Sequence, residues 1–206
     1  MAASNPLATP LDPVPLSPRA REYYERTFKP RLDAMQTDVA QMPLTILVWG
    51  PGQSNPELYA KRVQIRDELR QRGHAAFFSE DLAEQRPVNY SQKAIEFLEA
   101  SAADMVVVLQ VSYGSVAEVH DFADYRVINS KMLIFISDQA TDGYSYQGAL
   151  NELKTLYNNV DTFHPPDDIT SCRLKTLVLE KVSLLQLLKW RATMNARSWG
   201  ISSHAA

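Results

Sequence analysis

Several features that define common protein classes are missing from this sequence of 206 residues. It holds one cysteine, Cys172, which excludes an intrachain disulfide and a cysteine-based zinc site and makes a reducing cytoplasm the simplest setting. No apolar run approaches the ~18–20 residues that a membrane-spanning helix needs. The first residues lack the basic and then apolar stretches of a secretory signal, so we expect a cytoplasmic protein.

An excess of charge of one sign is also missing. The chain has 21 Lys and Arg residues against 24 Asp and Glu residues, which gives a formal net charge of −3. Nucleic-acid-binding domains are usually strongly basic, so this balance argues against a nucleic-acid partner. The sequence has no Walker loop, no Gly-x-Gly-x-x-Gly fingerprint, no metal-ligand spacing and no Ser-His-Asp set. We therefore expect no metal and no bound cofactor.

The amino-terminal part of the chain is rich in proline. Residues 1–17 carry four prolines and few charges, which is typical of an extended arm. Ser17 and Pro18 then fit the cap and first position of a helix, which we predict over residues 19–35 with a kink or break at Pro30. The pattern along the whole chain predicts three parts. They are a proline-rich arm with a helix over residues 1–40, a Rossmann-like core over residues 41–165, and a long helix within residues 166–206.

Short apolar runs alternate with helix-length segments in the central part. The runs are typical of buried strands; they lie at residues 44–49, 74–78, 105–109, 132–136 and 160–163. Predicted helices lie between them, over about residues 56–72, 90–100, 116–128 and 147–158. Strictly alternating strands and helices predict an α/β fold, a Rossmann or flavodoxin-like open parallel sheet of about five strands with helices on both faces.

The last segment, from about residue 169 to 197, reads as one long helix. Its apolar residues cover more than one helical stripe, which predicts burial on more than one side. Packing on the core and packing against a partner subunit would both account for this pattern. We therefore expect a homo-oligomer or a hetero-complex, and no membrane partner.

The turn after the third predicted strand holds the most informative residues. Gly114 lets the backbone turn sharply and approach a ligand closely. Ser115 is a good helix cap, and free N–H groups at a helix start attract anions or ligand oxygens. Glu118 follows three residues later, in the first turn of the predicted helix. The Ser-x-x-Glu spacing also fits a capping box, in which Glu118 accepts a hydrogen bond from the N–H of Ser115, and both interpretations stay open.

Several motifs follow one another over about residues 44–137: VWGPG, a helix with Arg62 and Arg66, the pair Glu80-Asp81, SAADMVVVL, GSVAEVHDFA and SKMLIFIS. Their order resembles the nucleoside 2-deoxyribosyltransferase-like superfamily, which is related in architecture to TIR domains and SLOG-type Rossmann-like domains. In that family the Glu of a Gly-Ser/Thr-x-x-Glu motif attacks the sugar C1′, which implies this role for Glu118. The family usually carries Asp just before that Gly, where this sequence has Ser112 and Tyr113.

The resemblance implies cleavage of an N-glycosidic bond, by hydrolysis or transfer, in a nucleoside, nucleotide or NAD-like molecule. A carboxylate near C1′ can stabilise the oxocarbenium charge or trap it as an ester. The expected substrate contacts are the backbone of Gly50, Pro51 and Gly52 for a sugar or phosphate, Arg62 for a phosphate, Asp81 for a ribose hydroxyl, Tyr113 for a base, and Gly114 and Ser115 for ribose or phosphate oxygens.

Structural interpretations compete with these roles. The turn at Gly50–Gly52 could simply reverse the chain, Arg62 and Arg66 could form a solvated helix face, and Glu80 and Asp81 could cap the following segment. Two other functions also remain open. One is a non-catalytic module that senses a nucleotide in the same cleft and uses the terminal helices for assembly, and the other is a structural or effector subunit without a small-molecule site.

Overall fold

A computed structural model describes residues 15–85, 90–110, 122, 124–140, 148 and 150–198. The chain forms two compact units, Met1–Val39 and Ala40–Ala206. The second unit contains the sheet and the candidate site. Among the described residues, no helix combines the length and the apolar character that crossing a membrane requires.

The described part of the first unit is a helix in three successive pieces. α1 spans Pro18–Tyr23, a π-helical turn spans Tyr24–Phe28, and α2 spans Lys29–Ala40. The Ser17 side chain caps α1 by accepting a backbone N–H at 3.3 Å, as predicted. Pro30 does not end the helix. A proline ring clashes with the carbonyl four residues earlier, and the wider π-helical turn just before it accommodates this conflict.

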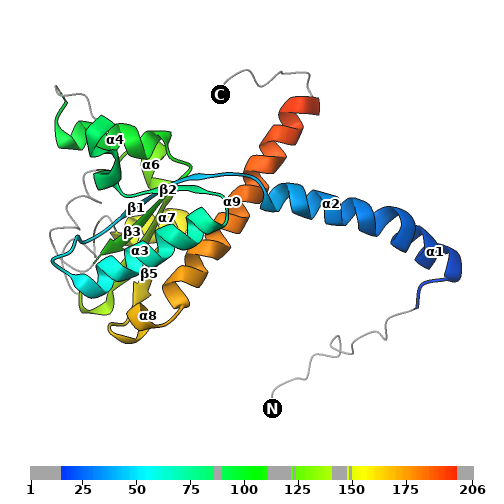
Figure 1. The fold of residues 1–206 in the computed structure, drawn as a ribbon, viewed down its shortest axis with the longest axis horizontal. Coiled ribbons are helices and arrows are strands. Elements are labelled where there is room, and N and C mark those ends of the chain that lie inside the picture. Colours follow the sequence, from blue (N-terminus) through cyan, green and yellow to red (C-terminus); the bar gives the residue numbers. More distant parts are fainter. Residues whose placement is uncertain are drawn as a thin grey trace, which may run out of the picture. The chain divides into compact units, whose positions relative to one another are not determined.

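The second unit is built on five parallel strands in the order β2-β1-β3-β4-β5 (Figure 1). The strands are β1 (Thr45–Trp49), β2 (Ala75–Phe77), β3 (Met105–Gln110), β4 (Met132–Ser137) and β5 (Val160–Phe163). Every neighbouring pair is parallel. The predicted α/β fold with a Rossmann or flavodoxin-like parallel sheet is therefore confirmed, and the strand order is the flavodoxin-like one.

Helices cover both faces of this sheet. They are α3 (Pro56–Gln71), α4 (Gln92–Ala102), α6 (Arg126–Asn129), α7 (Asn151–Tyr157), α8 (Asp167–Thr170) and α9 (Arg173–Ser198), and two 3₁₀ turns span Ser79–Gln85 and Asp138–Ala140. α3 and α9 pack together and contribute to one apolar cluster, whereas α4, α6 and α7 contribute to the other. The sheet therefore lies between two helical layers.

Strand β3 is buried along its whole length, and its side chains alternate between the two clusters. Met105, Val107 and Leu109 face the cluster of α3 and α9, whereas Val106 and Val108 face the cluster of α4, α6 and α7. Successive side chains of a strand point to opposite faces, so a central strand must be apolar at every position. This explains the unbroken apolar run in the sequence.

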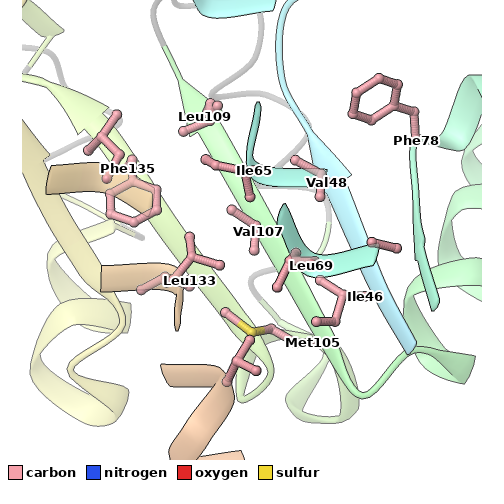
Figure 2. Packing of buried hydrophobic residues seen from close by; sticks show 14 of the residues in the cluster. Ile46, Val48, Ile65, Leu69, Phe78, Met105, Val107, Leu109, Leu133 and Phe135 are labelled. Atoms are coloured by element: carbon pink, nitrogen blue, oxygen red, sulfur yellow. The ribbon is translucent and has the colours of Figure 1, made fainter. Parts of the chain in front are cut away.

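Helix α3 covers the start of the sheet through regularly spaced apolar side chains. Figure 2 shows Ile65 and Leu69 of this helix lying over Ile46 and Val48 of β1 and Val107 of β3. All five side chains are at most 1% exposed. This packing fixes α3 against β1 and β3.

The long carboxyl-terminal helix packs on the core with one face. Leu174 and Val178 are fully buried in the cluster of α3, whereas Leu184, Leu187 and Leu188 are 49%, 40% and 47% exposed. Among the residues that the structure describes, α9 is therefore buried along one face, and the expected burial on more than one side is not seen there. The predicted single helix is also divided, because α8 ends before α9 begins.

A buried histidine should make the stability of this unit depend on pH. The N–H of Leu44 donates to Nδ1 of buried His74 at 3.3 Å. Burial, helped by the charge of Arg72, lowers the pKa of His74 below its ordinary 6.5. The unfolded chain then takes up a proton more readily than the folded one. The contribution of His74 to the free energy of unfolding is present above pH 6.5 and lost as the pH falls through the lowered pKa.

Urea denaturation between about pH 7.5 and about pH 5 measures this effect. His74→Gln keeps an acceptor for Leu44 but cannot be protonated, so its stability should fall less over this range than that of the wild-type protein. Equal losses in the two proteins would contradict the assignment.

Candidate functional site

The direction in which successive strands are added to the sheet reverses between β1 and β3. The chain leaves β1 towards β2 on one side, whereas it leaves β3 towards β4 on the other. In open α/β sheets, ligands bind outside the carboxyl ends of the strands at such a point. β1 ends at Trp49 and β3 ends at Gln110, so the turn Gly50–Gly52 lies directly at this edge.

The structure describes part of the predicted site. The described members are Gly50, Pro51, Gly52, Arg62 and Asp81. The members outside the described residues are Tyr113, Gly114, Ser115 and Glu118. Contacts of the first group join the turn after β1 to helix α3, and the second group belongs to the segment that follows β3 in the sequence.

Arg62 ties the end of β1 to the turn that follows it. Its side chain is 1% exposed, although arginine is rarely buried without partners. Nη2 donates to the carbonyl of Val48 at 2.9 Å and Nη1 to the carbonyl of Pro51 at 3.0 Å. The two nitrogens also contact the carboxylate of Glu80 at 3.1 and 3.2 Å. This burial contradicts the interpretation of Arg62 as part of a solvated helix face.

The sequence held a signal for this burial. Arg62 follows Leu58 by four residues and precedes Ile65 and Leu69 by three and seven, so it lies on the apolar stripe of α3. A charged residue on a core-facing stripe predicts a buried group with several hydrogen-bond partners. No pattern in the sequence predicts which groups these partners are, because they lie 11 to 18 residues away from Arg62.

Gly50 is required by close packing. Its φ is +151°, and a Cβ atom there would lie 3.0 Å from Cδ of Arg62 and 3.0 Å from the carbonyl oxygen of Leu109. The protein's own side chain and β3 therefore occupy the space beside Gly50. A Cβ at Gly52 would meet nothing within 4 Å, so the space beside Gly52 is open.

These two glycines give a matched pair of variants. We expect Gly50→Ala to lower the free energy of unfolding by about 2 kcal/mol or more, because the new methyl group meets a backbone carbonyl and the φ is unfavourable for alanine. Gly52→Ala should change stability by less than about 0.5 kcal/mol. Denaturant titration of both variants checks this, and equal effects would contradict the account of the turn.

Arg62, Arg66 and Arg70 lie one turn apart on α3. They pack against β2 and against Phe78, the residue that follows it. The Cζ atoms of Arg62 and Arg66 each lie 4.3 Å from the centre of the Phe78 ring. Nε of Arg70 donates to the carbonyl of Ala76 at 2.7 Å. Cation–π contacts of this kind stabilise an aromatic ring beside a guanidinium. The second strand is thus held by charged side chains as well as by the apolar core.

Asp81 has local partners. Its Oδ2 accepts the N–H of Phe78 at 3.1 Å and lies 3.4 Å from Nη2 of Arg70 and 3.7 Å from Nη1 of Arg66. Asp81 thus bonds back to the residue before its own 3₁₀ turn, Ser79–Gln85, and not to the following segment that the structural interpretation had it cap. The side chain is still 35% exposed, and its role towards a ribose hydroxyl stays a prediction.

Two aromatic residues that the sequence analysis did not single out border the turn. The indole Nε1 of Trp49 donates to Oγ of Ser79 at 2.8 Å, and its ring centroid lies 5.5 Å from that of Phe122. Both rings are buried. Phe122 lies four residues after Glu118, and no pattern in the sequence connects it with Trp49.

The comparisons with known proteins add no further assignment. No protein-family model and no curated protein matches the chain. In the part of the chain that the structure describes, no group of three or more His, Cys, Asp or Glu side chains is arranged to hold a metal ion. The resemblance to the deoxyribosyltransferase-like superfamily therefore stays a prediction, and the site is defined by topology and contacts.

Proposed function

We propose that this protein cleaves the N-glycosidic bond of a nucleoside, a nucleotide or an NAD-like molecule, with Glu118 as the catalytic carboxylate. The strand order is the observation that carries this proposal. The open turn Gly50–Gly52 follows β1, and the Gly-Ser-x-x-Glu sequence follows β3. These two strands flank the point at which open α/β sheets bind ligands.

The turn after β1 supports the proposal because hydrogen bonds from Arg62 anchor it and because the space beside Gly52 is open. The guanidinium of Arg62 donates hydrogen bonds to the carbonyls of Val48 and Pro51, and the space beside Gly52 is free for a ligand to approach. A pre-formed backbone turn can contact a sugar or phosphate with little loss of entropy. We assign Arg62 the role of positioning this turn, since its guanidinium is buried and bonded to protein groups.

Phe122 supports the assignment of Glu118. It packs on Trp49 at the end of β1, and Glu118 precedes it by four residues, about one turn of the predicted helix. A carboxylate in that first turn would be close to the substrate end of the sheet. Ser115 and Gly114 would then supply backbone N–H groups for ribose or phosphate oxygens.

In the proposed reaction the carboxylate of Glu118 attacks C1′ of the sugar as the C1′–N bond breaks, and the base leaves with the bonding electron pair. Water then cleaves the resulting ester in a hydrolase, or another nucleophile does so in a transferase. A cytoplasmic setting, in which nucleotides are abundant, is part of the proposal.

Base release tests the proposal. The protein is incubated with NAD, nucleosides and nucleotides, and the free base is measured by chromatography. Release from at least one substrate is expected. Glu57→Gln is the matched control for the same change at Glu118. It alters an exposed carboxylate in the first turn of α3 and should leave the rate of base release unchanged. An absence of release from every substrate would contradict an enzymatic function.

A nucleotide-sensing module is the second candidate function. The exposed leucines Leu184, Leu187 and Leu188 of α9 favour it, because they offer an apolar surface for assembly. In this case a nucleotide would raise the melting temperature without any base being released. The same incubation, followed by thermal unfolding, therefore separates the two functions.

A further inference from the structure

An aspartate and a histidine form a pair at the carboxyl edge of the sheet. Asp138 is the first residue after β4, and His164 is the first residue after β5. Nδ1 of His164 lies 2.9 Å from Oδ2 of Asp138. β3 and β4 end at the same level, because Gln110, the last residue of β3, is in register with Ile136. Neighbouring strands are about 5 Å apart, so the pair lies about 5 to 10 Å from the end of β3 along this edge.

The carboxylate determines which nitrogen of the imidazole can meet a ligand. The hydrogen bond with His164 is the main cause that lowers the pKa of Asp138 below its ordinary 3.8, so this carboxylate is ionised at neutral pH. An ionised carboxylate only accepts hydrogen bonds, and Nδ1 of His164 is therefore the donor. Among the described residues, Nε2 of His164 has no hydrogen-bond partner, and the side chain is 66% exposed. Nε2 is the nitrogen that a ligand can reach.

The backbone of His164 is also held in place. Its N–H donates to Oδ2 of Asp168 at 2.8 Å, and Nη1 of Arg173 donates to the same oxygen at 2.9 Å. Nη1 of Arg173 also donates to the carbonyl of Thr162 at 3.1 Å, which ties β5 to the start of α9. A group that acts on a substrate needs supporting contacts that fix its position. The end of β5 therefore presents an oriented imidazole.

Cleavage of a neutral nucleoside leaves a base that needs a proton. When the C1′–N bond breaks, the bonding electrons go to the base, which would leave as an anion without an acid. Histidine is the side chain that most often supplies such a proton. A purine is long enough to reach from a sugar at β3 towards β5, and its N7 can accept the proton.

We infer that His164 is the general acid of the proposed reaction, that Asp138 positions it, and that the substrate is a purine nucleoside or nucleotide. The proton on Nε2 passes to N7 of the base as the C1′–N bond breaks, and the imidazole is left neutral. This inference rests on the proposed function.

Guanosine and 7-methylguanosine, each with and without a 5′-phosphate, test the inference as a matched pair of substrates. The base of 7-methylguanosine is already cationic, so it leaves without an added proton. His164→Gln should lower the release of guanine about 10²-fold or more and change the release of 7-methylguanine less than about twofold. Asp138→Asn should lower the release of guanine about tenfold and also spare 7-methylguanine.

Arg173→Gln is the control for local structure. It removes a neighbouring cation, 41% exposed, and leaves the imidazole unchanged, so the ratio of the two rates should stay the same. Equal losses with both substrates in His164→Gln, as a merely structural role would give, would overturn the inference. Unchanged release of guanine in that variant would do so as well. If the wild-type protein releases other bases but no guanine, the inference fails and the proposed function stands; if it releases no base at all, both fail.

Discussion

Replacing Glu118 by glutamine is expected to lower base release about 10³-fold or more. Glutamine has nearly the same shape but lacks the negative charge that would attack C1′ or stabilise the oxocarbenium ion. The substitution also distinguishes the two interpretations of this residue. Glutamine serves in a capping box as well as glutamate does, so the fold and the melting temperature should be unchanged.

The measurement is the rate of base release by wild type and Glu118→Gln under the same conditions, with thermal unfolding as the check on folding. Ser115→Ala is a useful companion, because it removes the predicted cap and keeps the carboxylate. It should lose stability by about 1 kcal/mol and retain part of the activity. Full activity in Glu118→Gln would remove this residue from the catalytic role.

Replacing Arg62 by methionine is expected to lower the free energy of unfolding by about 3 kcal/mol. Methionine fills a similar volume but leaves the carbonyls of Val48 and Pro51 without their donor in a buried place. The loss should exceed that of a surface arginine several-fold. Because the turn after β1 would lose its anchor, substrate binding should weaken as well.

Arg72→Met is the matched control for this effect. Arg72 pairs with Glu68 one turn away, and its side chain is 52% exposed. Exposed pairs of this kind contribute little, so the expected change is below about 0.5 kcal/mol. A loss in Arg62→Met no larger than in Arg72→Met would contradict the anchoring role.

The sheet could be predicted from the sequence because its signals are local. The run 105–109 is apolar at every position, as a central strand requires, and the predicted fifth strand coincides with β5, Val160–Phe163. Helix ends were less certain. Pro30 was expected to kink or break a helix that in fact continues through a π-helical turn, and the chain turns at Ser171 between two helices where one was predicted.

The site could be predicted only in part. The position of Gly50–Gly52 at the end of β1 follows from strand polarity alone. The partners of Arg62 and the contact of Trp49 with Ser79 join segments that only the folded chain brings together. The sequence predicts Asp81 as a contact for a ribose hydroxyl and leaves Glu80 and Asp81 as possible caps. Their ion pairs with arginines of α3 depend on how this helix is placed on the sheet.

Binding of NAD at the turn after β1 is the most direct test of the central claim, that the edge between β1 and β3 is the ligand site. NAD is titrated into isotope-labelled Glu118→Gln protein, which should bind without turnover, and backbone amide resonances are followed by NMR. The account predicts a saturable shift of the Gly52 amide and none of the Gly73 amide, which lies at the other end of α3. An unchanged Gly52 amide at saturating NAD, nucleoside and nucleotide would contradict it.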